Sequence, residues 1–379
     1  MAFTLVHAVI HSFEKEKGTL LVDRSKTVKK ALFDPKKPTV ISLAEGIHGL
    51  LGKKGNNVVW GQFEPNGRQG RFPKSTETFS KGLSAEYFEA LTHVALGELI
   101  EQAKLETFST GGHTLFAYYV SDAIPFILVA NIKQRNGLRL GPDYIPEESV
   151  DIDMSKVHQA CRINLARFSE TLALLEDASE SNDNESEEAP DKTYLCFISK
   201  GRDSEASAYF IKGLGCTPGI ASTRATANAI EVIEDFFRDR DELAPFTAQA
   251  KDNVITYLSK KQQDEQKATL QGIQTAASAA IPPEQADLVE MLEALPEILN
   301  SEDSKIPEEF TVSKAILDKK TKIKGKSNRW SAQFDRSALS TSPDSIVCYN
   351  SAEATITFSD IPEAMKKMIE SELNGRIGS

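Results

Sequence analysis

The stretch of sequence that decides the fold lies at residues 111–132 and reads GGHTLFAYYVSDAIPFILVANI. Two glycines open it, and two apolar runs, 113–120 and 123–132, lie on either side of Ser121-Asp122. Runs rich in aromatic and β-branched residues around a short polar turn predict a β-hairpin. Because polar positions are nearly absent from both runs, the hairpin is expected to be buried on both faces.

Strand-like and helical patterns continue on both sides of this hairpin. Residues 3–13, 19–22, 58–63 and 194–198 are predicted strands, and residues 84–106 have the apolar spacing of a long helix. Residues 225–310 are helical in pattern almost throughout. The sequence therefore predicts an α+β protein with three parts. These are a mixed α/β core domain at 1–220, in which helices flank a mixed sheet, a helical segment at 221–305, and a small β-rich part at 306–379 with a basic loop, a β-hairpin and a terminal helix.

The charge of the chain is segregated along its length. The net charge of −11 and the pI near 5.2 would by themselves argue against nucleic-acid binding. Residues 1–74 nevertheless carry a net +7 and residues 311–329 a net +6, while residues 75–191 and 225–310 are acidic. A phosphate backbone responds to the field within roughly 10 Å, so a basic face on an acidic protein can still bind DNA.

The sharpest local signal is the run KKTKIKGKSNRW at residues 319–330. Alternating lysines followed by an arginine and a tryptophan suit phosphate contacts with an aromatic or minor-groove reader, presented by a mobile basic loop that leads into a β-hairpin. The alternative is a solvated sheet edge whose lysines prevent aggregation. The candidate nucleic-acid-binding residues here are Lys319, Lys320, Lys322, Lys324, Lys326, Arg329 and Trp330.

A second candidate site is the turn Ser199-Lys200-Gly201-Arg202 between a predicted strand and a helix. The positive end of a helix favours an anion, and Lys200, Arg202 and Lys212 in the following helix add charge. The alternative is an ordinary strand–helix turn, since the pattern of a P-loop is absent. The acidic run at residues 179–190 is expected to be a disordered surface loop that could compete with phosphate for Lys200 and Arg202.

The sequence contains little that points to catalysis, metal binding or a membrane span. Catalytic motifs such as GxSxG, HExxH and GxGxxG are absent, so no enzymatic activity and no cofactor are expected. The four cysteines form no CxxC pair, and Asp151 and Asp153 without further ligands make a poor metal site. Lys133, Arg135 and Arg139 either extend a basic face or form a charged exit loop. No apolar run is long enough to predict a membrane span, and the N-terminus lacks the pattern of a signal peptide.

Five stretches of the sequence point to a known family: GGHTLFAYY at 111–119, FILVA at 126–130, the Asp-Ile-Asp at 151–153, YLCFISKGR at 194–202 and AYFIKGLGC at 208–216. Together they resemble the bacterial nucleoid-associated proteins of the NdpA/YejK type, and the resemblance covers nearly the whole chain. It implies a cytoplasmic, nucleoid-localised protein that contacts double-stranded DNA and works alongside type II topoisomerases, and it supplies no catalytic residues.

The combined expectation is a nucleoid-associated homodimer that contacts the phosphate backbone largely without sequence specificity and so contributes to chromosome organisation. The alternative is an adaptor that regulates a DNA enzyme through its acidic helical segment, or a phage-defence component, with little direct DNA contact.

Overall fold

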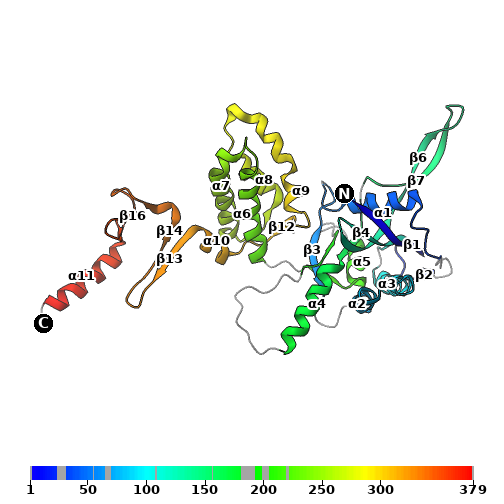
Figure 1. Cartoon of the computed structure of the whole chain (residues 1–379), viewed down its shortest axis with the longest axis horizontal. Helices are drawn as coiled ribbons and strands as arrows, with labels where there is room; N and C mark the ends of the chain where they lie inside the picture. The colour runs from blue at the N-terminus through cyan, green and yellow to red at the C-terminus, as the bar shows by residue number, and fades with distance from the viewer. Residues whose placement is uncertain are drawn as a thin grey trace.

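The computed structural model describes residues 2–23, 31–53, 55–64, 70–106, 109–155, 157–180, 193–198, 205–218 and 222–377. Its parts lie in a row along the long axis of the molecule (Figure 1): a sheet with helices around it, a bundle of helices, and an extended C-terminal part that ends in α11 (Glu363–Ile377). The predicted α+β class is confirmed.

The main sheet has the strand order β10-β3-β9-β8-β5-β4-β1-β2, and its described pairings are antiparallel. Its strands are β1 (Phe3–Lys15), β2 (Val22–Asp23), β3 (Val59–Phe63), β4 (Gly112–Ser121), β5 (Ile124–Ile132), β8 (Ala160–Asn164), β9 (Leu195–Phe197) and β10 (Cys216–Pro218). The predicted hairpin is β4 and β5, which pair with each other inside the sheet, with Phe116 opposite Val129.

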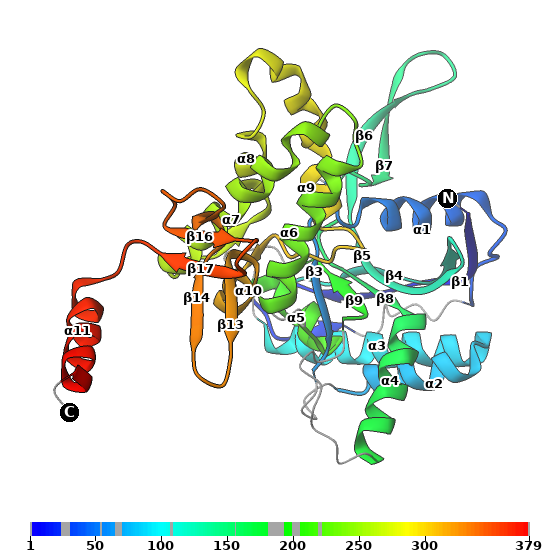
Figure 2. The same cartoon turned by 60° about the vertical axis from the view of Figure 1, so that its left-hand side comes forward.

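Helices cover both faces of this sheet, which explains why the hairpin is apolar throughout (Figure 2). Phe116 and Tyr118 belong to the core beneath α2 and α3, whereas Leu115 and Tyr119 belong to the core beneath α1. The predicted long helix is α3, and Ser84 caps it by accepting a hydrogen bond from a main-chain N–H of the first turn. The helices of this part are α1 (Pro38–Leu50), α2 (Phe72–Gly82), α3 (Ala85–Leu105), α4 (Leu165–Glu180) and α5 (Glu205–Gly213).

The helical part has a hydrophobic core of its own. Its elements are α6 (Ser222–Arg238), α7 (Thr247–Gln263), α8 (Leu270–Ser278), α9 (Leu295–Leu299) and α10 (Lys314–Thr321), the 3-10 segments η1 (Ala244–Phe246) and η2 (Pro283–Ala294), and the short strands β11 (Ala268–Thr269) and β12 (Glu309–Phe310). That core includes Ile306, Phe310 and Leu317, which come after the predicted boundary at residue 305. The boundaries of the three parts stay predictions.

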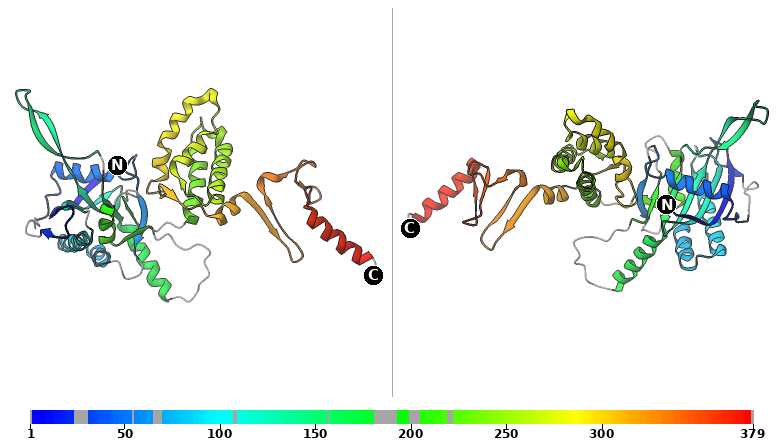
Figure 3. Two further views of the ribbon diagram at one scale, coloured as in Figure 1. Left: turned by 180° about the vertical axis from the view of Figure 1, so that it is seen from behind. Right: turned by 45° about the horizontal axis from the view of Figure 1, so that its top comes forward.

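The C-terminal part projects away from the hydrophobic cores of the sheet part and of the helical part (Figure 3). It contains β13 (Lys322–Lys326), β14 (Ser331–Asp335), η3 (Arg336–Ala338), β15 (Leu339–Ser340), β16 (Val347–Asn350), β17 (Thr355–Phe358) and α11. The run expected to be a basic loop is therefore the end of α10 and the first strand of the hairpin itself. The physical reason is the period of two in Lys322–Lys326, where lysines alternate with Ile323 and Gly325.

Two further predictions concern residues that the structure describes only in part. The turn at 199–202, with Lys200 and Arg202, lies outside the described residues. Residues 181–190 of the acidic run also lie outside them, while residues 179 and 180 are the last two of α4.

Candidate nucleic-acid interface

The β13–β14 hairpin is amphipathic, and its lysines share one face. In the antiparallel register Lys322 lies opposite Asp335, Lys324 opposite Gln333, and Lys326 opposite Ser331. Because paired residues of antiparallel strands point to the same side, this face is polar. We call it the lysine face. Its opposite face is apolar, and there the ring of Phe334 lies 5.6 Å from that of Phe358 in β17.

The lysine face continues into an open groove of about 1350 Å³ between α7, α10 and the base of the hairpin. Lys322 and Asp335, a cross-strand pair of the lysine face, both line this groove, so the face opens toward it. The lining holds seven basic and four acidic residues, an excess of positive charge in a chain whose net charge is −11. The basic residues are Lys251, Lys260, Lys314, Lys319, Lys320, Lys322 and Arg336.

Some of these lysines already have carboxylate partners. Lys320 lies 3.1 Å from Glu231 of α6, and Lys322 lies 2.7 Å from Asp318 of α10. The hydrogen bond between Lys322 and Asp318 raises the pKa of the ammonium group and lowers that of the carboxyl group, so both stay charged. Lys324 and Lys326 are exposed, and no carboxylate of the described chain lies within ion-pair distance of either.

Trp330 and Arg329 lie at the turn of the hairpin. The main-chain N–H groups of both donate to the hydroxyl of Ser327, which fixes the turn. The indole of Trp330 lies over Gly325, because a Cβ added there would come within 3.3 Å of the ring. Since a Cβ at Gly325 would point away from the lysine face, the ring covers the opposite side of the hairpin. The structure therefore separates the lysines from the tryptophan that was expected to act with them.

The other predicted residues lie elsewhere. Lys212 is at the end of α5, in the sheet part, and its ammonium group lies 3.2 Å from Glu106. Figure 1 shows α5 and β13 in different parts of the molecule. The structure thus brings together the residues at 319–326 and leaves Lys212 apart from them.

Sequence reasoning missed four basic residues of the groove: Lys251, Lys260, Lys314 and Arg336. Lys251 and Lys260 are on α7, about sixty residues before the hairpin, and Lys251 also pairs with Glu234 at 2.5 Å. The helical spacing of Asp252, Thr256 and Lys260 marks one side of α7, but nothing in the sequence says that this side faces α10.

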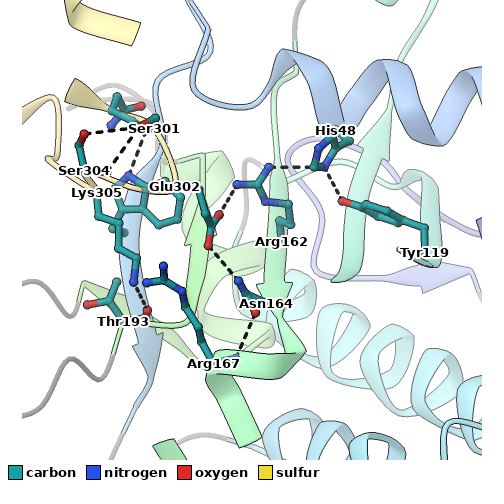
Figure 4. Close-up of polar contacts among 12 residues, drawn as sticks. His48, Tyr119, Arg162, Asn164, Arg167, Thr193, Ser301, Glu302, Ser304 and Lys305 are labelled. Atoms are coloured by element: carbon teal, nitrogen blue, oxygen red, sulfur yellow. Dashed lines mark hydrogen bonds and ion pairs between the residues drawn. The ribbon is translucent and has the colours of Figure 1, made fainter. Parts of the chain in front are cut away.

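A buried polar junction holds the helical part against the sheet (Figure 4). Arg162 of β8 donates to Glu302, which follows α9, at 2.6 Å, and the other carboxylate oxygen of Glu302 accepts from Asn164 at 3.2 Å. Only 8% of Arg162 is exposed. Burial alone would lower the pKa of Arg162, but the nearby Cys196, Glu302 and Tyr119 raise it above its usual value, so the guanidinium group stays charged.

His48 borders this junction as a neutral side chain. Its Nδ1 lies 2.8 Å from the hydroxyl of Tyr119 and 3.5 Å from a guanidinium nitrogen of Arg162. Burial and then the charge of Arg162 lower the pKa of His48 to about 4. At neutral pH His48 therefore adds no second positive charge beside Arg162, which pairs with Glu302.

Asn300 adds a second, uncharged connection between the same parts. Its side-chain amide accepts from the main-chain N–H of Val58 at 2.9 Å and donates to the carbonyls of Val58 and Ile306 at 3.0 and 2.8 Å. The indole of Trp60 donates to the carbonyl of Asn300 at 3.2 Å. Because Asn300 is fully buried, these bonds fix the position of the helical part, and of the groove on it, relative to the sheet.

The described ranges contain no group of three or more His, Cys, Asp or Glu residues that could hold a metal ion. No helix in them has both the length and the apolar character needed to cross a membrane.

Comparison with known proteins decides the family. A family model described as nucleoid-associated protein YejK matches residues 9–366. The chain belongs to the YejK family of nucleoid-associated proteins. Similar members of this family include a nucleoid-associated protein of Pseudomonas putida (strain F1), 21% identical over 95% of this chain and 96% of the relative. Another is that of Pseudomonas aeruginosa (strain UCBPP-PA14), 22% identical over 96% of each chain. The resemblance seen in the sequence is confirmed.

Proposed function

We propose that this member of the YejK family is a nucleoid-associated protein that binds the phosphate backbone of duplex DNA with the lysine face and the groove beside it. The observation that supports this most directly is the shared face of Lys322, Lys324 and Lys326, which continues into a groove with more basic than acidic residues. Strand residues rise about 3.3 Å each, so these lysines recur roughly every 6.6 Å. Lysines at that spacing can each meet a different phosphate of one DNA strand.

The contacts would carry little sequence preference. Lysines on an exposed strand reach phosphates as point charges, and phosphate contacts set position without reading bases. Trp330, on the other face of the hairpin, is poorly placed to contact bases at the same time as the lysines contact phosphates. Lys200, Arg202 and Lys212 stay candidates for a second contact.

The test is the salt dependence of binding to a fluorescent DNA duplex, followed by anisotropy. Each phosphate contact contributes about −0.9 to the slope of log K against log salt, so Lys324→Ala with Lys326→Ala should reduce the slope by up to about 1.8. The matched control is Lys366→Ala with Lys367→Ala in α11, which removes the same charge from the exposed terminal helix. Its slope should equal that of the wild type.

Several outcomes would contradict the proposal. A slope that falls equally in both double variants would show that only net charge matters. Tighter binding to duplex RNA or to single-stranded DNA, run in the same salt series, would overturn the choice of ligand. A wild-type protein without salt-dependent binding would favour the adaptor alternative, in which the acidic segment at 225–310 contacts a DNA enzyme. The expected link to type II topoisomerases is tested separately, by DNA relaxation with and without this protein.

A further inference from the structure

Two cysteine thiols lie in contact inside the core of the sheet part. The sulfur of Cys161, in β8, lies 3.6 Å from the sulfur of Cys216, at the start of β10, although the two residues are 55 positions apart in the sequence. All four cysteines of the chain are free. Cys161 and Cys216 share one hydrophobic core, whereas the buried Cys196 belongs to the core on the other face of the sheet.

The two thiols form a short chain of hydrogen bonds. The thiol of Cys216 donates to the carbonyl of Leu214 at 3.8 Å, so its sulfur can accept from the thiol of Cys161. This hydrogen bond, and then burial, raise the pKa of Cys161 well above its usual value. The thiol of Cys161 therefore stays protonated and unreactive as long as the core is closed.

Cys216 is the thiol of this pair that a reagent from solvent reaches first. It is 9% exposed, whereas Cys161 is completely buried. β10 is a strand of three residues at the edge of the main sheet, where β3 is its neighbour. Because local opening of a short edge strand requires less free energy than opening of the core, a small reagent can reach the pair without global unfolding.

We propose that Cys161 and Cys216 are a redox-modification site at which hydrogen peroxide forms a disulfide. An S–S bond is about 2.05 Å long, so the sulfurs must approach each other by about 1.5 Å, which a rotation of either side chain can provide. The site would be a reversible one, since thiols restore a disulfide to the reduced pair by exchange.

The reaction proceeds in two displacements. The sulfur of Cys216 attacks one oxygen of the peroxide, the O–O bond breaks, and the departing hydroxide takes up the thiol proton to give water and a sulfenic acid. The sulfur of Cys161 then attacks the sulfur of Cys216, the S–O bond breaks, and a second water leaves with the proton of Cys161. The two thiols lose two electrons in total, and the peroxide is reduced to water.

The disulfide would fix an edge strand to the interior of the sheet. β8 lies between β5 and β9, while β10 follows α5 and precedes α6, the first helix of the helical part. The new bond would close a loop of 55 residues and restrain the chain where it passes from the sheet part to the helical part. This modification does not depend on the proposed DNA contact, which involves β13 and the groove beside it.

The first experiment identifies the bond itself. The full chain is treated with hydrogen peroxide, the remaining thiols are alkylated after denaturation, and the peptides are analysed by mass spectrometry without reduction. The expected product joins the peptide of Cys161 to that of Cys216 and is lighter than the two reduced peptides by the mass of two hydrogens. Cys216→Ala should abolish this product, and Cys348→Ser, which removes the partly exposed thiol of the C-terminal part, should leave it unchanged. Because the joined peptides are detected in the wild type, the result does not depend on the folding of a variant.

The second experiment measures whether the disulfide restrains β10. The main-chain N–H of Glu64, just after β3, donates to the carbonyl of Gly215 beside Cys216 at 2.8 Å. Hydrogen exchange of this amide should slow by at least about tenfold in the oxidised wild type and recover when dithiothreitol is added. Peroxide should leave the exchange unchanged in Cys216→Ala.

Four results would overturn the proposal. Cys216 recovered as a sulfinic acid, with Cys161 still a free thiol, would show that the two sulfurs do not react with each other. Disulfides that involve Cys196 or Cys348 in place of the expected pair would assign the oxidation to other thiols. A bond that forms only in urea would show that the folded chain keeps the sulfurs apart. Unchanged exchange at Glu64 in the oxidised protein would show that the bond does not restrain β10.

Discussion

The replacement of Glu302 by alanine tests whether the junction between sheet and helical parts depends on its buried ion pair. In the structure one carboxylate oxygen of Glu302 accepts from Arg162 at 2.6 Å and the other from Asn164 at 3.2 Å. The substitution removes both contacts and leaves a guanidinium group that is 9% exposed at its side chain without its balancing charge. His48 cannot replace that charge, because it is cationic below a pKa of about 4 and neutral above it.

The loss of unfolding free energy in Glu302→Ala is expected to come mainly from the unpaired charge that stays on Arg162, and less from the lost hydrogen bonds. Removing one partner of a buried ion pair typically costs about 3–5 kcal/mol, mostly because the other charge stays buried and unpaired. Glu302 itself is 22% exposed, so water can reach part of the vacated space and the lower end of that range, about 3 kcal/mol, is expected. Arg162→Met together with Glu302→Leu removes both charges and should recover most of that loss.

The control is another ion pair across the same junction. Lys53 and Glu297 lie 3.0 Å apart with side chains 59% and 33% exposed, so Glu297→Ala should cost less than about 1 kcal/mol. Urea unfolding gives the stability of each variant, and hydrogen exchange of the Val58 amide, which donates to Asn300, reports opening of the junction. Equal losses in Glu302→Ala and Glu297→Ala, or a double variant no more stable than Glu302→Ala, would refute the reasoning.

Three further predictions follow from single side chains. The pKa of His48 is lowered from 6.5 to about 4, so between these pH values the unfolded state binds a proton that the folded state does not. The free energy of unfolding should therefore fall by up to about 3 kcal/mol as the pH drops from about 6.5 to 4. His48→Gln should remove this pH dependence from the unfolding curves. Asn300→Ala leaves buried main-chain groups without partners and should lower the unfolding free energy by about 3 kcal/mol in urea titrations. Trp330→Ala should change DNA affinity less than threefold in anisotropy titrations, because the ring covers Gly325; a loss of tenfold or more would show that it stacks on bases.

Elements buried on both faces or along one clear stripe could be predicted from the sequence. The hairpin β4–β5 and the helix α3 were predicted because their apolar pattern is continuous over many residues and has distinct ends, such as Ser84 at the start of α3. The hairpin of β6 (Gln134–Leu140) and β7 (Pro146–Ile152) was missed for the opposite reason. Its apolar residues Leu138 and Val150 alternate with charged ones and have no cover, so the same stretch was interpreted as a basic face or a charged loop.

The site could be predicted only where it is local in sequence. The lysines at 319–326 lie close together in the sequence, so the basic segment could be predicted, although it was expected to be a loop and the structure places it at the end of α10 and in β13. The groove also requires α7, and the junction requires Glu302 to meet Arg162 across 140 residues. A lone arginine inside an apolar strand does indicate that a buried partner exists, because a charge is rarely buried unpaired. Which of the 55 acidic residues supplies that partner is decided by tertiary packing alone.

The pairing of lysines with nearby carboxylates explains how an acidic protein can hold a basic groove. Lys320 and Lys322 are matched by Glu231 and Asp318, so part of the positive field is cancelled before any ligand arrives. A phosphate that binds there must compete with a carboxylate, and the gain in free energy is the difference between two ion pairs. Lys324 and Lys326, further out on the same face, face no such competition among the described residues. The hairpin would therefore supply most of the salt-dependent affinity, and the groove would mainly orient the backbone that the hairpin holds.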